Sequence, residues 1–232
     1  MKRFIALFLA LLMLCLVSLS SCFGGDGEWL DSYEEENDSE TEKQFQSFDE
    51  LEHKSDDKFA LDEIITFTHS GGKTPIEKNS IFFIGDNGDG GIRPFKSLDT
   101  LIEYKNISGP FGVDIGDSIT DVAESLSIDT GYAALVKIGG SYHMYDEKEG
   151  IDMSGGKGGC LYLGYAQDPS GEWAFMDYEM LTATLRGQLI IKGATEDYNV
   201  VVVSCTVDAN QNLKHLSILY GELNAVMTLV SN

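Results

Sequence analysis

The sequence predicts an α+β fold: an antiparallel sheet of hairpins or a meander, with one or two short helices packed on it, after a disordered acidic tether. Short segments rich in β-branched and aromatic residues recur from residue 64 onward, separated by Gly, Asn and Asp. Long helices alternating with strands, as a doubly wound parallel sheet requires, are missing from this pattern. Changes in composition divide the chain into segments 1–21, 22–58 and 59–232.

The first segment, 1–21, has the pattern of a secretory signal peptide. Lys2 and Arg3 precede an apolar run, 4–17, and small polar residues follow that run. The run is shorter than the ~20 residues that cross a bilayer, and no positive cluster comes after it. We therefore expect the segment to direct export and to be removed, with no membrane-spanning segment later in the chain.

The signal peptide leads into Leu19-Ser20-Ser21-Cys22, which resembles the lipobox of bacterial lipoproteins. In that family a diacylglycerol is attached to the cysteine thiol, cleavage makes the cysteine the new N-terminus, and an N-acyl chain such as palmitate can be added. The resemblance implies lipidation of Cys22 and anchoring at the extracytoplasmic face of the cell membrane, because two acyl chains anchor stably where one binds marginally. The alternative is an ordinary signal peptide with Cys22 incidental.

The second segment, 22–58, is the predicted tether. Its acidic residues far outnumber its three lysines, and low hydrophobicity combined with like charge prevents a chain from burying enough apolar surface to fold. Charge repulsion extends such a chain, so the tether holds the domain away from the lipid surface. The alternative, an isolated polar helix in the acidic stretch, lacks an apolar stripe.

The charge balance narrows the range of partners. The chain has 38 Asp and Glu against 16 Lys and Arg, a formal net charge of −22. Nucleic acid is not an expected partner, because it is bound by basic patches, and anionic headgroups repel an acidic domain. Cationic partners and divalent cations remain, and the charge also serves solubility.

The third segment, 59–232, holds the expected sheet. A polar turn, 208–212, connects the last two strands, and 70–79 and 167–171 have the composition of turns. Thr182 and Thr184 favour a strand over a helix in the ambiguous segment 180–193. Strands are expected at 64–68, 81–85, 160–166, 172–178, 199–207 and 213–221, with a hairpin over 133–146.

Two segments favour helices, 95–104 and the stretch GVDIGDSITDVAESL, 112–126. In the second, an apolar stripe at i, i+3, i+4 and i+7 follows the candidate caps Asp117 and Ser118. This stretch resembles the turn and helix that open small exported lipoprotein domains of the small protein A/outer-membrane lipoprotein A family and of β-lactamase-inhibitor-like domains. The resemblance implies a helix packed on an antiparallel sheet and a role in protein binding, envelope assembly or inhibition.

Asp86, Asn87 and Asp89 are the metal-ligand candidates, within GDNGDGG, 85–91. Counting from Asp86 or Asn87 puts no glutamate at the twelfth position of an EF-hand loop, so a hairpin turn is favoured over a cation site.

Cys160 and Cys205 are the two cysteines of the domain, and an exported protein permits either a disulfide between them or two buried thiols.

No catalytic residues are assigned. The four histidines are scattered without metal-ligand spacing, and no serine-hydrolase elbow is present. No cofactor is expected besides the lipid on Cys22. We expect a non-enzymatic binding module anchored to the membrane, with an envelope protein or a cell-wall component as partner. The alternatives are a cell-wall-modifying hydrolase with a carboxylate site and a lipoprotein that binds a cation or solute.

Overall fold

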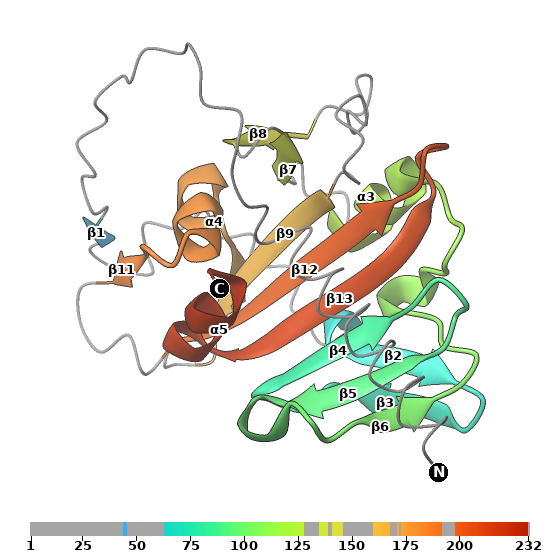
Figure 1. Cartoon of the computed structure of the whole chain (residues 1–232). Helices are drawn as coiled ribbons and strands as arrows, with labels where there is room; N and C mark the ends of the chain where they lie inside the picture. Colours follow the sequence, from blue (N-terminus) through green and yellow to red (C-terminus); the bar gives the residue numbers. More distant parts are fainter. Residues whose placement is uncertain are drawn as a thin grey trace, which may run out of the picture.

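The computed structural model describes residues 44–45, 63–127, 135–138, 141–145, 160–167, 171, 173–191 and 198–231. Nine strands in this part form one antiparallel sheet: β4 (Ser80–Ile84), β5 (Gly90–Pro94), β6 (Ile102–Tyr104), β7 (Leu135–Ile138), β8 (Ser141–Met144), β9 (Cys160–Gln167), β10 (Trp173–Phe175), β12 (Asn199–Val207) and β13 (Leu213–Glu222). Their order is β6-β5-β4-β13-β12-β9-β7-β8, and β10 pairs with β9 (Figure 1).

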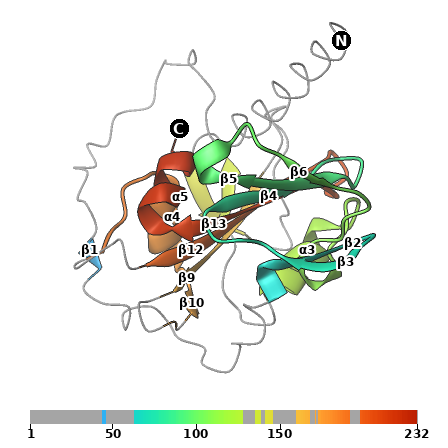
Figure 2. The same ribbon diagram turned by 90° about the horizontal axis from the view of Figure 1, so that it is seen from below.

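Two layers cover the sheet, one on each side (Figure 2). On the first side lie α3 (Ile119–Ser127) and the hairpin of β2 (Thr66–His69) and β3 (Gly72–Pro75). On the second side lie α4 (Tyr178–Leu185) and α5 (Leu223–Val230). We call these the α3 side and the helix-pair side.

Each side has its own apolar core, because successive side chains of a strand point to opposite faces. On β12, Val201 and Val203 belong to the α3-side core, and Val200 and Val202 belong to the helix-pair core. Strands buried on both faces contain continuous apolar runs, which is why 200–203 is an unbroken run of valines.

The α+β prediction is confirmed, and so are several of its elements. The hairpins β7–β8 and β12–β13, the pair β9–β10, and β4 all lie where the pattern predicts strands. The helix expected after residue 118 is α3, whose cap is Ser118: its hydroxyl accepts the N–H of Asp121 at 3.2 Å.

Three elements differ from the prediction. The segment 95–104 is no helix: a 3₁₀ turn, η2 (Phe95–Ser97), precedes β6, because pairing with β5 overrides the local apolar spacing. The connection predicted over 70–79 contains β3, which pairs with β2. The strand β2 itself begins at Thr66, after a helical turn at Glu63 and Ile64.

The expectation of a strand within 180–193 is wrong for most of its length. The segment begins inside α4, whose first turn is capped by the Asp177 carboxylate, which accepts the N–H of Met180 at 2.7 Å. The Thr184 hydroxyl donates to the Met180 carbonyl at 2.8 Å, so this threonine is accommodated inside the helix. Among the described residues of this segment, Ile190–Ile191 form the strand β11, and α5 was not predicted.

The predicted signal peptide and most of the tether lie outside the described residues. Within the tether, the structure describes only β1 (Gln44–Phe45), which pairs in parallel with β11. Cys22 therefore keeps its assignment as a prediction. Of the helices described in the structure, none has the length and apolarity of a bilayer-spanning helix.

Candidate functional site

The helix-pair side of the sheet is divided into a part that α4 and α5 cover and a part that these two helices do not cover. Strand register sets four residues in one cross-strand row under the helices: Gly164, Val202, Leu219 and Ile81. The side chains of Leu181 on α4 and Val226 on α5 belong to the same buried cluster as this row. This part of the face is an ordinary apolar core.

Beyond the helices, the same face becomes polar. We call its half-exposed residues the polar strip; they come from four adjacent strands and comprise Phe83, Arg93, Thr206, His215 and Ser217. None of them belongs to the cluster beneath α4 and α5. Residues directly opposite on antiparallel strands share a face, so register alone places Ser217 beside Phe83, and Thr206 beside His215.

Arg93 forms the end of the strip toward β6. Its guanidinium carbon lies 5.5 Å from the centre of the Phe83 ring, and its Nη1 donates to the carbonyl of Leu98 at 3.1 Å. The ring and the carbonyl together orient the guanidinium, which leaves a positioned donor group beside an aromatic surface.

His215 lies on β13, directly opposite Thr206 on β12. Burial lowers the pKa of His215, the nearby Asp86 carboxylate opposes this by raising it, and Lys214 lowers it further. The imidazole is therefore neutral at pH 7, with one nitrogen to donate and one to accept a hydrogen bond.

A cluster of cations and tyrosines adjoins the strip. The same cross-strand row that holds Thr206 continues through Cys160 and Lys137 to Tyr142. The Lys137 Nζ lies 5.6 Å, and the Arg186 guanidinium carbon 5.9 Å, from the centre of the Tyr142 ring. Burial lowers the pKa of Lys137 and raises the pKa of Tyr142, and Arg186 lowers the latter.

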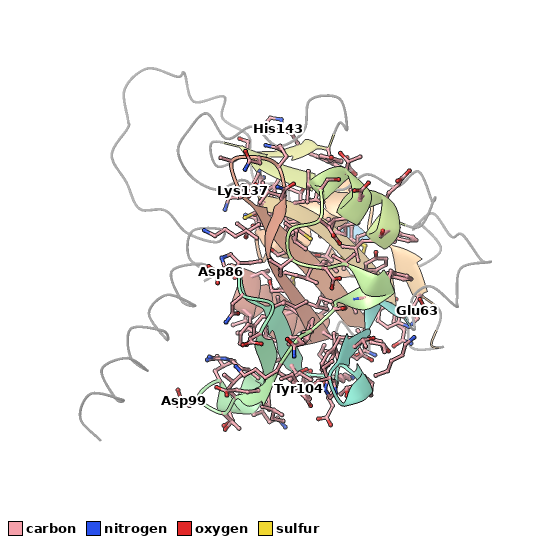
Figure 3. The ribbon with its side chains drawn as sticks, turned by 90° about the vertical axis from the view of Figure 1, so that its right-hand side faces the viewer. Glu63, Asp86, Asp99, Tyr104, Lys137 and His143 are labelled. Carbon is pink, nitrogen blue, oxygen red and sulfur yellow. The ribbon has the colours of Figure 1, made fainter. Side chains whose placement is uncertain are left out.

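Figure 3 shows Lys137 and Asp86 along the side of the sheet away from Glu63, which begins the β2–β3 region. His143 lies on β8 at the far end of the same row of strands and is exposed. His69 is tied into the hairpin of β2 and β3, where its Nε2 lies 2.9 Å from the Thr74 hydroxyl. The described histidines are thus separate from one another, and His53 lies outside the described residues.

The metal-ligand candidates occupy the turn between β4 and β5, which confirms the hairpin interpretation of GDNGDGG. The Asn87 side chain accepts the N–H of Asp89 at 3.0 Å. The Asp89 Oδ2 accepts a hydrogen bond from the Lys105 Nζ at 2.7 Å, and this ion pair lowers the pKa of Asp89. Asp86 is exposed. A cation at Asp89 would have to displace Lys105, and no group of three metal-ligating side chains occurs among the described residues.

The disulfide between Cys160 and Cys205, one of the two alternatives that the sequence leaves open, is not formed. Register places Thr206 opposite Cys160 and places Leu161 opposite Cys205, so the two cysteine side chains point to opposite faces of the sheet. Cys205 is a free thiol in the α3-side core, and burial raises its pKa to about 12. Cys160 belongs to the helix-pair core.

None of the five residues of the polar strip is an acid. A hydrolase with a carboxylate site predicts a buried acid with a raised pKa. In the part of the chain that the structure describes, the buried polar residues are Ser80, Thr182, Thr184 and Ser204, and none is an acid. The polar strip instead combines one aromatic ring, two hydroxyls, an imidazole and a guanidinium on paired strands.

Sequence reasoning did not find the strip. Its members are separated by up to 134 positions, and each one alone is an ordinary strand residue. One signal was available: in β12, Val200 and Val202 are followed on the same face by Ser204 and Thr206. A scan against protein-family models gives no match, nor do searches of curated proteins and of solved structures.

Proposed function

We propose that this chain is a lipoprotein, anchored through Cys22 at the extracytoplasmic face of the cell membrane, whose domain 59–232 is a non-enzymatic module that binds an envelope protein. The lipobox resemblance and the acidic composition of the tether support the anchored arrangement. The polar strip is the proposed contact surface.

One observation carries the proposal: the two faces of β12 change differently along the strand. Toward α3, the strand is apolar from end to end, through Val201, Val203, Cys205 and Val207. Toward the helix pair, it is apolar only where the helices cover it and carries Ser204 and Thr206 beyond them. The change is confined to one face, so it does not reflect the fraying of a strand end.

The composition of the strip favours a protein partner. Aromatic residues and arginine are enriched at protein interfaces and commonly carry most of the binding energy. Phe83 and Arg93 already contact each other and are fixed on paired strands, so little side-chain ordering opposes association. The carboxylates Asp86 and Glu103 border this surface and favour basic residues on the partner.

The anchor is tested with the full chain in its native host. Replacing Cys22→Ala is expected to abolish incorporation of labelled palmitate and to move the protein from the membrane fraction to the soluble extracytoplasmic fraction. Retention of both label and membrane attachment in this variant would contradict the lipid anchor.

The binding surface is tested by site-specific photocrosslinking in the same cells. A photoreactive residue in place of Ser217 is expected to capture a discrete envelope protein. The same residue in place of Asp121, which is exposed on α3 across the sheet, is the matched control and is expected to capture none. Capture from position 121 alone, or of wall polymer alone from position 217, would overturn the assignment.

A further inference from the structure

The edge strand β6 lies next to the polar strip and lacks a partner on its outer side among the described residues. A strand in this position presents backbone N–H and C=O groups that can pair with another chain. Proteins usually protect such edges with a lysine, a proline or a covering element. The lysine that follows β6, Lys105, is instead held by Asp89 at 2.7 Å.

Exposed apolar side chains concentrate at this edge. Of the large apolar residues that are exposed in the described part of the chain, two lie here: Ile102, 48 % exposed, and Leu98, 41 % exposed. Leu101 lies over Gly91, where its Cδ1 is 2.8 Å from the position a Cβ would take. Tyr104 is half-buried and contacts the α3-side core. An edge with apolar side chains toward both sides of the sheet suits an added strand, whose own side chains alternate between those sides.

The charges at the edge indicate the chemistry of that strand. Asp99 and Glu103 are exposed on either side of Ile102 (Figure 3 labels Asp99 and Tyr104 at this end of the sheet). A second copy of the chain would bring another formal charge of −22 to the same place, which opposes self-association. A segment with alternating apolar and basic residues matches both the exposed apolar groups and the carboxylates.

We propose that β6 receives an extended segment with apolar and basic residues from another protein, which pairs with the sheet as an added edge strand. This inference rests on the proposed binding function and names the mode and the chemistry of the contact. Because β6 has only three residues, few backbone bonds are available, and contacts to Leu98, Leu101 and Ile102 must supply much of the affinity.

The test uses the full chain solubilised in nonionic detergent and a seven-residue probe peptide of alternating lysine and valine. Its counterpart of alternating glutamate and valine controls for the apolar content. We expect the basic peptide to bind, the acidic peptide not to bind, and bound basic peptide to slow amide hydrogen exchange at residues 102–104 at least about tenfold.

The variants Glu103→Lys and Ile102→Lys place a positive charge at the edge. Each is expected to lower the affinity of the chain for the basic peptide about tenfold. Glu77→Lys changes the net charge by the same amount as Glu103→Lys, on an exposed residue after β3, and is the matched control for that variant, with unchanged affinity. Thermal melting of each variant verifies that the fold is intact.

Equal weakening by Glu103→Lys and Glu77→Lys, or binding without protection of residues 102–104, would overturn strand addition. Absence of binding by the basic peptide would overturn it as well. Crosslinking from position 217 is independent of these results: if it succeeds while the peptide test fails, the proposed function stands without this mode of contact. If position 217 captures nothing while the peptide protects β6, the edge is correct and the polar strip is not.

Discussion

Gly164 on β9 lies beneath α4, where the helix packs against the sheet. A Cβ at this position would be 2.7 Å from the Leu181 Cδ1 and 2.7 Å from the Met176 Sδ. Both neighbours are buried, so neither can move into solvent. The methionine side chain is adaptable, but Leu181 is held in the helix-pair core.

We predict that Gly164→Ala lowers the free energy of unfolding by about 1–2 kcal/mol. Overpacking a filled core costs about 1–3 kcal/mol, and replacing glycine by alanine in an accessible conformation returns about 0.4–1 kcal/mol through the unfolded chain. Urea unfolding of the full chain, followed by far-ultraviolet circular dichroism, measures the difference.

Gly85→Ala is the matched control, because a Cβ there meets its nearest atoms at 3.4 and 3.6 Å, an ordinary contact distance. We expect that variant to stay within about 0.5 kcal/mol of the parent. Leu181→Ala removes the clashing group. The double variant should therefore lose less free energy of unfolding than the sum of the losses in the two single variants, by at least about 0.5 kcal/mol. Strict additivity, or equal losses for Gly164→Ala and Gly85→Ala, would refute the packing argument.

Three further predictions concern single groups. Cys205 should resist maleimide at pH 8 in the folded chain and react after unfolding, because burial keeps its side chain in the thiol form. Mass spectrometry of the labelled peptides measures the reaction, and rapid labelling of Cys205 in the folded chain would contradict this prediction. Lys105→Met should raise the pKa of Asp89, which an NMR titration measures. The parent chain has a pairing between Lys105 and Asp89 that stabilises the fold at neutral pH and is lost in acid as Asp89 takes up a proton, and the variant should lack this contribution. His215→Gln should flatten the fall in stability below about pH 6.5, where the unfolded chain takes up the proton first. An unchanged pH dependence of urea unfolding in this variant would count against the burial of His215.

The elements that sequence reasoning found are those whose signals are local. The hairpin β12–β13 follows from two apolar runs and a polar turn, where the Asp208 carboxylate accepts the N–H groups of Asn210 and Asn212. α3 follows from an apolar stripe and a cap. Asp114 donates its backbone N–H to the Asp117 carboxylate at 2.7 Å, so these two acids organise the turn before the helix.

The errors have a common physical origin in tertiary pairing. Threonines favour strands when judged alone, yet Thr184 is buried in α4 and bonds within the helix. The cap of α4, Asp177, lies inside the segment 172–178 that the strand pattern covers. In 95–104 the spacing fits a helix, but Ile102 pairs with Ile92 on β5, a contact that only the whole sheet establishes.

The polar strip and the edge strand form one continuous surface. Ser217 lies opposite Phe83, Phe83 lies opposite Gly91, and Gly91 lies opposite Glu103, so a single cross-strand row runs from the strip to β6. A segment added beside β6 would place the rest of its protein next to that row, on the side that the described helices leave uncovered. The proposed partner would account for two features together: the change from apolar to polar side chains on one face of the sheet, and the exposed apolar groups at its edge.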